Sequence, residues 1–255
     1  MAVPNLSMTG KVAIVTGARR GIGRAFALAF AEAGADVAIC DIAEAMSELE
    51  TVAEEIRKLG RRALAIQADI SHKADVESMV NKVAAELGNI DVLINNAGIN
   101  PLASIFDTGE DTWDKVMDIN VKGCFLCSQA VARLMVERKK GNIINMASAN
   151  GYRALVNRSA YCVSKAAVIM LTKVLARELG KYNVRVNAIA PFVTKTPMLE
   201  DVFKDPEWVK VRLADVALGR FGQTDDITGA ALFLASDAAS WVTGQTFSVD
   251  GGYMA

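Results

Sequence analysis

The sequence is poor in the residues that nucleophilic triads and metal sites require. Its 255 residues include a single histidine, His72, and four cysteines. One histidine makes a Ser-His-Asp triad or a histidine-rich metal site an improbable basis for activity. Cys124 and Cys127 form a Cys-x-x-Cys pair, but no second pair completes a zinc site, and the pair falls in a helical pattern. We therefore expect buried thiols and no metal.

An excess of one charge and long apolar runs are also lacking. The chain has 28 basic and 29 acidic residues and a net charge of -1, which removes the electrostatic footprint of a nucleic-acid or membrane-surface protein. No apolar run approaches the roughly 20 residues of a membrane span. Residues 1–10 show no charged region followed by an apolar stretch, as a signal peptide would. We expect a soluble cytoplasmic protein with neither nucleic-acid nor membrane partners.

Short apolar segments alternate with amphipathic segments along the chain. The expected strands are residues 12–16, 36–40, 63–67, 92–95, 142–146, 184–189 and 246–249. The expected helices are residues 21–33, 43–59, 74–87, 113–138, 160–179 and 225–235. This alternation predicts an α/β fold, a doubly wound parallel sheet of about seven strands with helices on both faces. Because no linker interrupts it, residues 1–255 are expected to form a single domain, with a lid or substrate loop at 194–223.

A glycine-rich turn follows the first expected strand and opens the first expected helix. It reads Thr16-Gly17-Ala18-Arg19-Arg20-Gly21-Ile22-Gly23. Such glycines let a pyrophosphate approach the backbone at a helix N-terminus, whereas an ordinary glycine turn would need no such placement. Asp41 ends the second strand, where its carboxylate would bind the adenosine ribose hydroxyls and repel the 2′-phosphate of NADP. Arg19 and Arg20 favour NADP, but Asp41 would be within contact range, so the turn predicts NAD.

Further motifs make the chain resemble the short-chain dehydrogenase/reductase family. They are Asn95-Asn96-Ala97-Gly98, Asp118-Ile119-Asn120-Val121, Ser148, Tyr161-Cys162-Val163-Ser164-Lys165, Val242-Thr243-Gly244-Gln245 and Val249-Asp250-Gly251-Gly252. The resemblance extends from about residue 10 to residue 252, and the interval of 13 residues from Ser148 to Tyr161 is usual for the family. One position departs from the pattern: Phe192 follows Pro191 where the family has glycine. We expect Phe192 to reshape the exit of the cofactor or to form a wall of the substrate pocket.

Tyr161 and Lys165 are four residues apart on an expected helix and therefore share one face. A tyrosine pKa of about 10 is too high for a base at neutral pH, but a neighbouring ammonium group lowers it. Tyr161 would then take the proton of an alcohol or return one to a ketone, while Ser148 fixes the substrate oxygen. A surface Tyr–Lys pair and a turn serine are the ordinary alternatives. The resemblance implies that Lys165 also holds the nicotinamide ribose and that Asn120 holds a proton-relaying water.

The resemblance also implies a set of cofactor contacts and self-association. Thr196 is expected at the nicotinamide carboxamide, and Asp69 with Ile70 at the adenine. The full expected cofactor set is Gly17, Arg19, Arg20, Gly21, Ile22, Gly23, Asp41, Ile42, Asp69, Ile70, Asn96, Ala97, Gly98, Tyr161, Lys165, Pro191 and Thr196. A homotetramer is expected, with interfaces on the helices at 113–138 and 160–179 and on the last strand.

Polar residues between Ser148 and Tyr161 bear on the substrate. Asn150, Arg153 and Arg158 favour a small polar alcohol, such as a polyol, a sugar acid or a hydroxy acid paired to an arginine. Two alternatives stay open at this point. The arginines would instead face solvent or a subunit boundary, or an apolar pocket would be lined by Met198, Phe203 and Trp208. The rival functions are an NADPH-dependent 3-oxoacyl-type ketoreductase and a non-catalytic nucleotide sensor.

Overall fold

The computed structural model describes residues 5–42 and 46–255. Its centre is a seven-stranded sheet in the order β3-β2-β1-β4-β5-β6-β7, in which every pairing is parallel. The strands are β1 (Val12–Thr16), β2 (Asp36–Asp41), β3 (Ala63–Gln67), β4 (Val92–Asn95), β5 (Gly141–Met146), β6 (Val184–Pro191) and β7 (Thr246–Val249). The strand order reverses between β1 and β4, as it does in doubly wound sheets. The expected α/β fold is confirmed.

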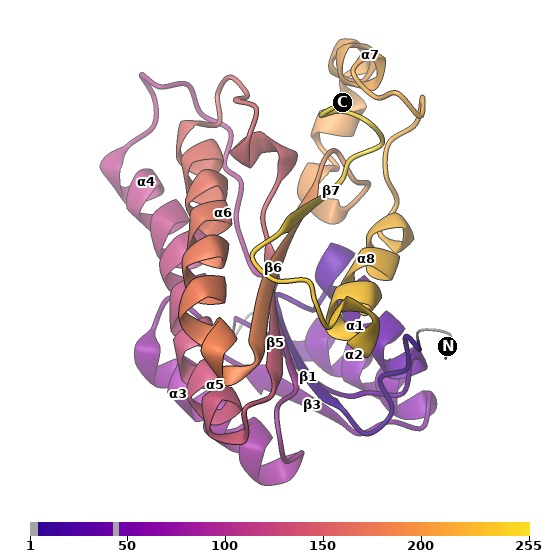
Figure 1. Ribbon diagram of the computed structural model, residues 1–255. Coiled ribbons are helices and arrows are strands. Elements are labelled where there is room, and N and C mark those ends of the chain that lie inside the picture. The colour runs from indigo at the N-terminus through magenta and orange to yellow at the C-terminus, as the bar shows by residue number, and fades with distance from the viewer. Residues whose placement is uncertain (1–4, 43–45) are drawn as a thin grey trace.

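Helices cover both faces of this sheet. They are α1 (Gly21–Glu32), α2 (Met46–Lys58), α3 (Lys73–Glu86), α4 (Glu110–Met117), α5 (Cys124–Arg138), α6 (Ser159–Leu179), α7 (Pro206–Ala214) and α8 (Asp225–Ala235). Figure 1 shows α1, α2 and α8 on one side of the sheet and α3, α5 and α6 on the other. The start at residue 43 that the sequence predicts for α2 lies outside the described residues.

Most positions in the central strands are apolar because these strands bury both of their faces, whereas no residue of the edge strand β7 is fully buried. In β1, Ala13 and Val15 belong to one core cluster and Val12 and Ile14 to the other. Phe26 of α1 is fully buried in the first cluster. Truncating such a residue to alanine costs about 3–5 kcal/mol of stability, so these two cores fix the sheet and, with it, the edge where the strands end.

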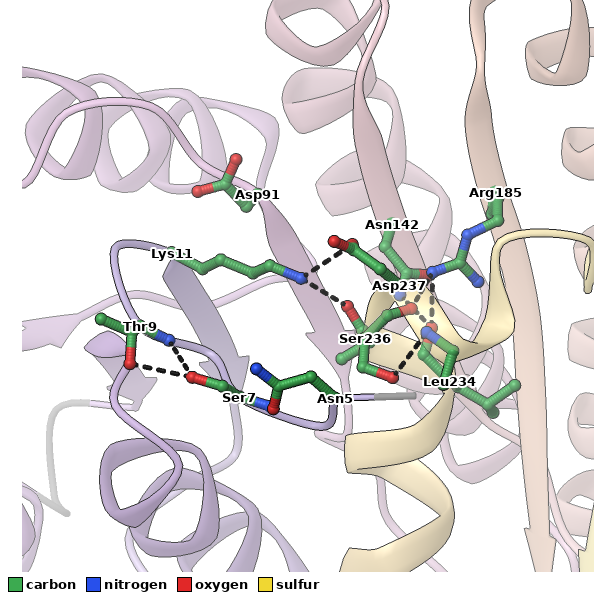
Figure 2. Close-up of polar contacts among 12 residues, drawn as sticks. Asn5, Ser7, Thr9, Lys11, Asp91, Asn142, Arg185, Leu234, Ser236 and Asp237 are labelled. Atoms are coloured by element: carbon green, nitrogen blue, oxygen red, sulfur yellow. Dashed lines mark hydrogen bonds and ion pairs between the residues drawn. The ribbon is translucent and has the colours of Figure 1, made fainter. Parts of the chain in front are cut away.

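Polar side chains fasten the C-terminal end of α8 to the amino edge of the sheet (Figure 2). Lys11 Nζ donates to the Ala235 carbonyl at 3.4 Å, and Arg185 Nη2 donates to the Leu234 carbonyl at 2.7 Å. Asn142 Nδ2 also donates to Leu234 O. The last carbonyls of a helix lack partners within the helix and attract cations, which explains the two basic side chains. This anchor leaves the carboxyl edge of the sheet free for ligands.

Residues 194–223 contain more helix than the sequence predicts. Two short 3₁₀ turns precede α7, and no residue of α7 is fully buried, so its apolar periodicity is weak. The helix is instead specified by its start. Asp205 accepts hydrogen bonds from the backbone N–H groups of Glu207 (3.0 Å) and Trp208 (3.2 Å), and Pro206 occupies the first helical position.

One described stretch, Ser159–Tyr182, is long and apolar enough to cross a membrane by length and composition alone. It consists of α6 and the turn after it. Within it, Lys165 and Thr172 are buried polar residues, and α6 packs along β6. A helix that covers the sheet of a globular core accounts for this apolar character.

Candidate active site

The candidate residues gather where β1, β4, β5 and β6 end. In open parallel sheets, ligands bind beyond the carboxyl ends of the strands, at the point where the strand order reverses. Here that point lies between β1 and β4. The glycine turn follows β1, Asn96 follows β4 and Ser148 follows β5. Tyr161 and Lys165 come from α6, which packs on β6.

The glycine turn is too close to its neighbours for side chains. Gly17 has a φ of 64°, and a Cβ atom there would lie 2.7 Å from the Cα of Ala97. A Cβ atom on Gly23 would lie 2.3 Å from the Gly17 carbonyl oxygen. Asn96 Nδ2 fastens the turn by donating to the Thr16 and Gly17 carbonyls at 2.9 and 3.0 Å. Glycine is therefore required by the local geometry.

The start of α1 is left open to an anion. Arg20 at the N-cap makes no side-chain capping bond, and the first turn holds no acidic residue. The first backbone N–H groups of a helix have no partners within the helix, so they suit a pyrophosphate. A Cβ atom on Gly21 would lie 3.5 Å from Thr196 Cγ2, which brings the predicted carboxamide ligand close to this turn. Ile22 packs partly into the core below it. These groups fit a dinucleotide.

Asp41 lies against the backbone of the same turn. Its Oδ2 accepts from the Arg19 N–H at 3.4 Å, and its Oδ1 accepts from the Ile42 N–H at 2.9 Å. The side chain of Arg19 is paired with two carboxylates. Its Nε lies 3.7 Å from Asp41 Oδ2, and its Nη1 lies 3.2 Å from Glu48 Oε1. Arg20 is exposed. The negative charge of Asp41 is thus fixed at the turn, whereas the charge of Arg19 is already balanced.

Asp69 and Ile70, the residues predicted to contact the adenine, both make contacts within the protein. Asp69 Oδ1 accepts from the N–H and hydroxyl of Ser71 at 2.9 and 2.7 Å, which closes the turn after β3. Burial opposes the ionisation of Asp69, but these bonds outweigh it and hold its pKa below the usual value. Ile70 occupies the space over Gly123, where a Cβ atom would lie 2.6 Å from Ile70 Cδ1. Contact of these two residues with a cofactor stays a prediction.

Ser148 and Tyr161 form the candidate proton-transfer pair. Ser148 Oγ accepts from the Asn150 N–H at 3.1 Å, so its own hydroxyl hydrogen is available for another partner. Tyr161 stands in the first turn of α6 and is partly buried. Burial raises the pKa of Tyr161 above its usual value, and the neighbouring Ser148 hydroxyl and the charge of Arg158 oppose that rise. The surroundings therefore supply two of the influences that favour a phenolate.

Lys165 supplies a buried ammonium group beside this pair. The residue is 5% exposed, and its Nζ donates to the Met146 carbonyl at 2.7 Å. Nζ lies 5.6 Å from the centre of the Tyr161 ring. Burial lowers the pKa of Lys165 to about 8, and the neighbouring Cys124 thiol opposes that shift. Near neutral pH the group is mostly charged, which is the form that stabilises a phenolate.

Asn120 lies in a π-helical turn, Asp118–Gly123, that separates α4 from α5. The sequence predicts one helix over residues 113–138, and the structure is helical throughout this range but contains the π turn, which the sequence analysis did not predict. Asn120 Oδ1 accepts from the Ile99 N–H at 2.8 Å, and Nδ2 donates to the Ile99 carbonyl and to Ser164 Oγ, both at 3.0 Å. Ser164 in turn donates to the Tyr161 carbonyl at 2.7 Å. Single π turns are frequent at functional sites, and the asparagine within an amphipathic pattern was the sequence signal.

A Cβ atom on Gly98 would lie 3.1 Å from Asn120 Oδ1 and 3.6 Å from Lys165 Nζ. The absence of a side chain at Gly98 therefore lets these two polar groups meet the end of β4. The structure brings Asn120, Ser148, Tyr161 and Lys165 to one place, as the sequence predicts. Their catalytic roles stay predictions.

A chain of buried polar groups beneath the site was missed by the sequence analysis. Asn95 Nδ2 donates to Asn145 Oδ1 and to Ser128 Oγ, both at 2.9 Å, and Asn145 Nδ2 donates to Thr172 Oγ1 at 2.9 Å. Cys124 Sγ lies 3.3 Å from Asn145 Oδ1. Burial raises the pKa of the Cys124 thiol to about 12. The sequence signal was that each of two strands has an asparagine at or near its end. In the structure these residues, Asn95 and Asn145, are paired across β4 and β5.

The three candidate substrate residues have different surroundings. Arg158 is 7% exposed, and its Nη1 donates to the Asn100 carbonyl (2.8 Å) and to Asn100 Oδ1 (2.7 Å). Arg158 thereby holds the loop after β4 in place. The sequence analysis expected this arginine to face the substrate, solvent or a subunit boundary, and did not anticipate this role. Arg153 is exposed. Asn150 Oδ1 is buried and has no hydrogen-bond partner among the described residues.

A cavity of about 900 Å³ is formed by residues between Lys195 and Gln223. Its walls include Thr196, Phe203 and Phe221, and Phe203 packs edge-on against Trp208. Its volume lies within the range of cavities that hold small ligands. Of the three residues that the apolar-pocket alternative names, Phe203 lines this cavity, whereas Met198 and Trp208 do not.

Comparison with known proteins places this geometry in a family. The family model described as enoyl-(acyl carrier protein) reductase matches residues 17–254. An NAD-dependent glycerol dehydrogenase of Listeria innocua is 41% identical over 98% of this chain and 96% of its own. A 3-oxoacyl-(acyl-carrier-protein) reductase of Synechocystis is 39% identical over 96% of this chain and 98% of its own.

A solved structure agrees as well. The gluconate 5-dehydrogenase from Burkholderia cenocepacia, crystallised in complex with NADP and tartrate, has a TM-score of 0.94 and 36% identity, with 98% of each chain covered. The relatives are dehydrogenases and reductases that match the chain almost from end to end, as the motifs indicated. The chain therefore belongs to the short-chain dehydrogenase/reductase family, whose members are oxidoreductases that use a nicotinamide cofactor on alcohol and carbonyl groups.

Proposed function

We propose that this protein is an NAD-dependent dehydrogenase that oxidises the secondary alcohol of a small polar substrate, or reduces the matching ketone. The observation that carries the proposal is the buried Lys165 ammonium 5.6 Å from the Tyr161 ring, with Ser148 acting to lower the pKa of the same tyrosine. A tyrosine beside a buried cation can act as a base near neutral pH. A nucleotide sensor has no need of this arrangement.

In the oxidation, the Tyr161 phenolate takes the proton of the substrate hydroxyl while the Ser148 hydroxyl donates to the same oxygen. The ammonium of Lys165 stabilises the phenolate before the transfer. NAD, when bound at the glycine turn, would supply the oxidant by accepting the hydride that leaves the carbinol carbon. Asn120 holds the Ile99 peptide and Ser164, which fixes the position of the first turn of α6. In the reverse direction Tyr161 returns the proton.

The preference for NAD rests on Asp41. Its carboxylate is bound to the backbone of the glycine turn, at the end of β2, where an adenosine ribose would lie. Its charge would repel a 2′-phosphate, and Arg19 is already paired with Asp41 and Glu48. The Listeria relative is named for NAD, while the Burkholderia structure holds NADP. In this chain Asp41 favours NAD.

A polar substrate is supported by the exposed Arg153 and by the relatives that are named for glycerol and gluconate. The second candidate is an NADPH-dependent 3-oxoacyl-type ketoreductase, which the Synechocystis relative and the partly apolar cavity favour. The two candidates differ in cofactor and in substrate. Each can therefore be tested by itself.

The test is the change in absorbance at 340 nm when purified protein meets NAD or NADP and a panel of polyols, sugar acids, hydroxy acids and simple alcohols. We expect NAD to be reduced faster than NADP, and Asp41→Ala to reduce the NAD:NADP ratio of kcat/KM by about tenfold or more. Glu48→Ala, which removes the other carboxylate paired with Arg19, is the matched control. Unchanged cofactor selectivity in Asp41→Ala would show that Asp41 is not the selector.

We also propose a cytoplasmic homotetramer built on α5 and α6. The exposed apolar residues of these helices are Phe125 (39%), Val163 (45%), Met170 (57%) and Val174 (43%). An apolar patch of this kind marks an interaction surface. Multi-angle light scattering should give four times the chain mass of 27.2 kDa. Replacement of Met170 by glutamate should shift the protein toward smaller species.

A further inference from the structure

We propose that Arg153 binds the carboxylate of an anionic substrate and that Tyr253 and Phe192 hold its guanidinium in place. The substrates of this site are then hydroxy acids or sugar acids rather than neutral polyols. The inference rests on the proposed dehydrogenase function and names the substrate class of that same site. It begins with the position at which the sequence departs from its family.

Phe192 and Tyr253 form a face-to-face aromatic stack, although they lie far apart in the chain. Their ring centres are 3.6 Å apart, and the planes differ by 8°. The guanidinium carbon of Arg153 lies 4.8 Å from the centre of the Tyr253 ring. Because Phe192 covers one face of that ring, Arg153 occupies the other. The three side chains therefore form one ordered column, Phe192–Tyr253–Arg153.

The column is fixed at its centre. Tyr253 is 4% exposed. Its segment is closed by Asp250, which accepts from the N–H groups of Gly252 (3.0 Å) and Met254 (3.1 Å). Gly251 O also accepts from the Leu218 N–H at 3.0 Å, which ties the segment to residues 194–223. Because Tyr253 is buried and its backbone segment is held by these hydrogen bonds, its ring presents a fixed face to a cation.

The outer member of the column faces solvent close to Ser148. Ser148 caps the short turn Ala149–Gly151, and the Arg153 N–H donates to the Ala149 carbonyl at 3.0 Å. Arg153 is exposed, and among the described residues its side chain makes no salt bridge. Arg158, the other arginine between Ser148 and Tyr161, is buried and used by Asn100. Within the described part of the chain, Arg153 is thus an unpaired cation next to the turn that Ser148 caps, and it is available to an anion.

The chemistry of the guanidinium identifies the ligand. Its planar set of N–H donors matches the two oxygens of a carboxylate and binds them in a bidentate manner. An arginine that is already ordered loses less side-chain freedom on binding, so stacking on Tyr253 strengthens the contact. The carboxylate itself is unchanged in the reaction. It positions the hydroxyl-bearing carbon, while the proton and the hydride follow the route described above.

Phe192 is the specificity feature of this column. It directly follows Pro191, the last residue of β6. The family pattern has glycine, which lacks a side chain, at this position. A glycine there would leave the inner face of Tyr253 uncovered. Phe192 and Tyr253 are accordingly positioning residues that act through Arg153, and Arg153 is the group that touches the substrate.

The test compares kcat and KM for pairs of substrates that differ only in charge, such as glycerate against glycerol and gluconate against a neutral hexitol. In Arg153→Met, the ratio of kcat/KM for the acid to kcat/KM for the neutral polyol should fall at least tenfold, mainly through KM, as loss of a charge-assisted hydrogen bond requires. Arg153→Lys should recover part of the ratio. Tyr253→Leu and Phe192→Gly should lower it in the same direction, and Tyr253→Phe, which keeps the stack, should preserve it.

A matched control comes from Lys181 and Tyr182, where a cation also lies over a ring, at 5.0 Å, after α6. Tyr182→Leu should leave the acid-to-polyol ratio unchanged. If Arg153→Met oxidises acids and polyols with the ratio of the unmodified protein, the inference is wrong while the proposed function stands. If no substrate of either class is oxidised with NAD or NADP, the proposed function itself fails. Equal losses for both classes in Tyr253→Leu would indicate a structural role only and would overturn the positioning role.

Discussion

Replacement of Lys165 by methionine should stabilise the fold while removing activity. Burial lowers the pKa of Lys165 from 10.5 to about 8. At about 1.36 kcal/mol per pKa unit, a shift of roughly 2.5 units means that the charged lysine destabilises the folded state by about 3 kcal/mol. Methionine fills a similar volume without a charge, but it leaves the Met146 carbonyl without its donor, at a cost of about 1–2 kcal/mol. The expected net gain is therefore about 1–2 kcal/mol.

The gain should depend on pH in a defined way. The folded-state pKa of Lys165 is lower than its unfolded value, so between about pH 8 and pH 10.5 the unfolded chain binds more protons, and the stability of the unmodified protein rises with pH. The advantage of Lys165→Met should be full at pH 7 and should shrink as pH rises from 8 to 10. Groups remote from Lys165 titrate equally in both proteins, so their effects cancel in the difference.

Thermal unfolding followed by circular dichroism at pH 7, 9 and 10, at one protein concentration and without nucleotide, measures this difference. For a domain of this size the gain corresponds to a rise in Tm of about 2–8 °C at pH 7. Lys82→Met, at an exposed position of α3, is the matched control and should change Tm little at any pH. A Lys165→Met protein that is less stable than the unmodified protein at pH 7, or whose difference does not change with pH, would refute the reasoning.

Two further predictions concern groups around Tyr161. The charge of Arg158 opposes the rise in the Tyr161 pKa that burial causes, so Arg158→Gln should move the acidic limb of the pH profile of alcohol oxidation to higher pH. Arg158→Lys, which keeps the charge, should move it less, and identical profiles for all three proteins would contradict the coupling. Asn120→Ala removes three hydrogen bonds that hold Ile99 and Ser164. It should lower kcat about a hundredfold through misplacement of α6, whereas retention of full kcat would show that the π turn does not position the site.

The regular part of the fold was open to prediction because its signals are local. Every residue of β1 and β4 is buried, and these strands could be placed from short apolar runs alone, as could the less buried β3 and β7. The glycine turn was predictable for a similar reason, since a strand, a set of glycines and a helix follow one another directly. What holds that turn, the contact of Gly17 with Ala97, joins segments far apart in the chain and has no local signal.

The less regular features depend on long-range contacts. The π turn exists because Asn120 reaches back to Ile99, and no helical pattern reveals such a partner. No residue of α7 is fully buried, so the helix needs no continuous apolar face. Its sequence therefore lacks the apolar periodicity by which helices are recognised. The burial of Arg158 depends on Asn100, and the stacking of Phe192 depends on Tyr253 near the far end of the chain. The sequence marked Phe192 as a departure but contained nothing that identified its partner.

The most direct test of the account is the steady-state rate of NADH formation by Tyr161→Phe, measured at 340 nm beside the unmodified protein on its best substrate. Phenylalanine keeps the ring and removes only the hydroxyl that transfers the proton. The account predicts that kcat falls by about 10²–10⁴-fold while NADH still binds, as fluorescence titration would show. Full turnover by Tyr161→Phe would contradict the assignment of Tyr161 as the acid/base and, with it, the proposed mechanism.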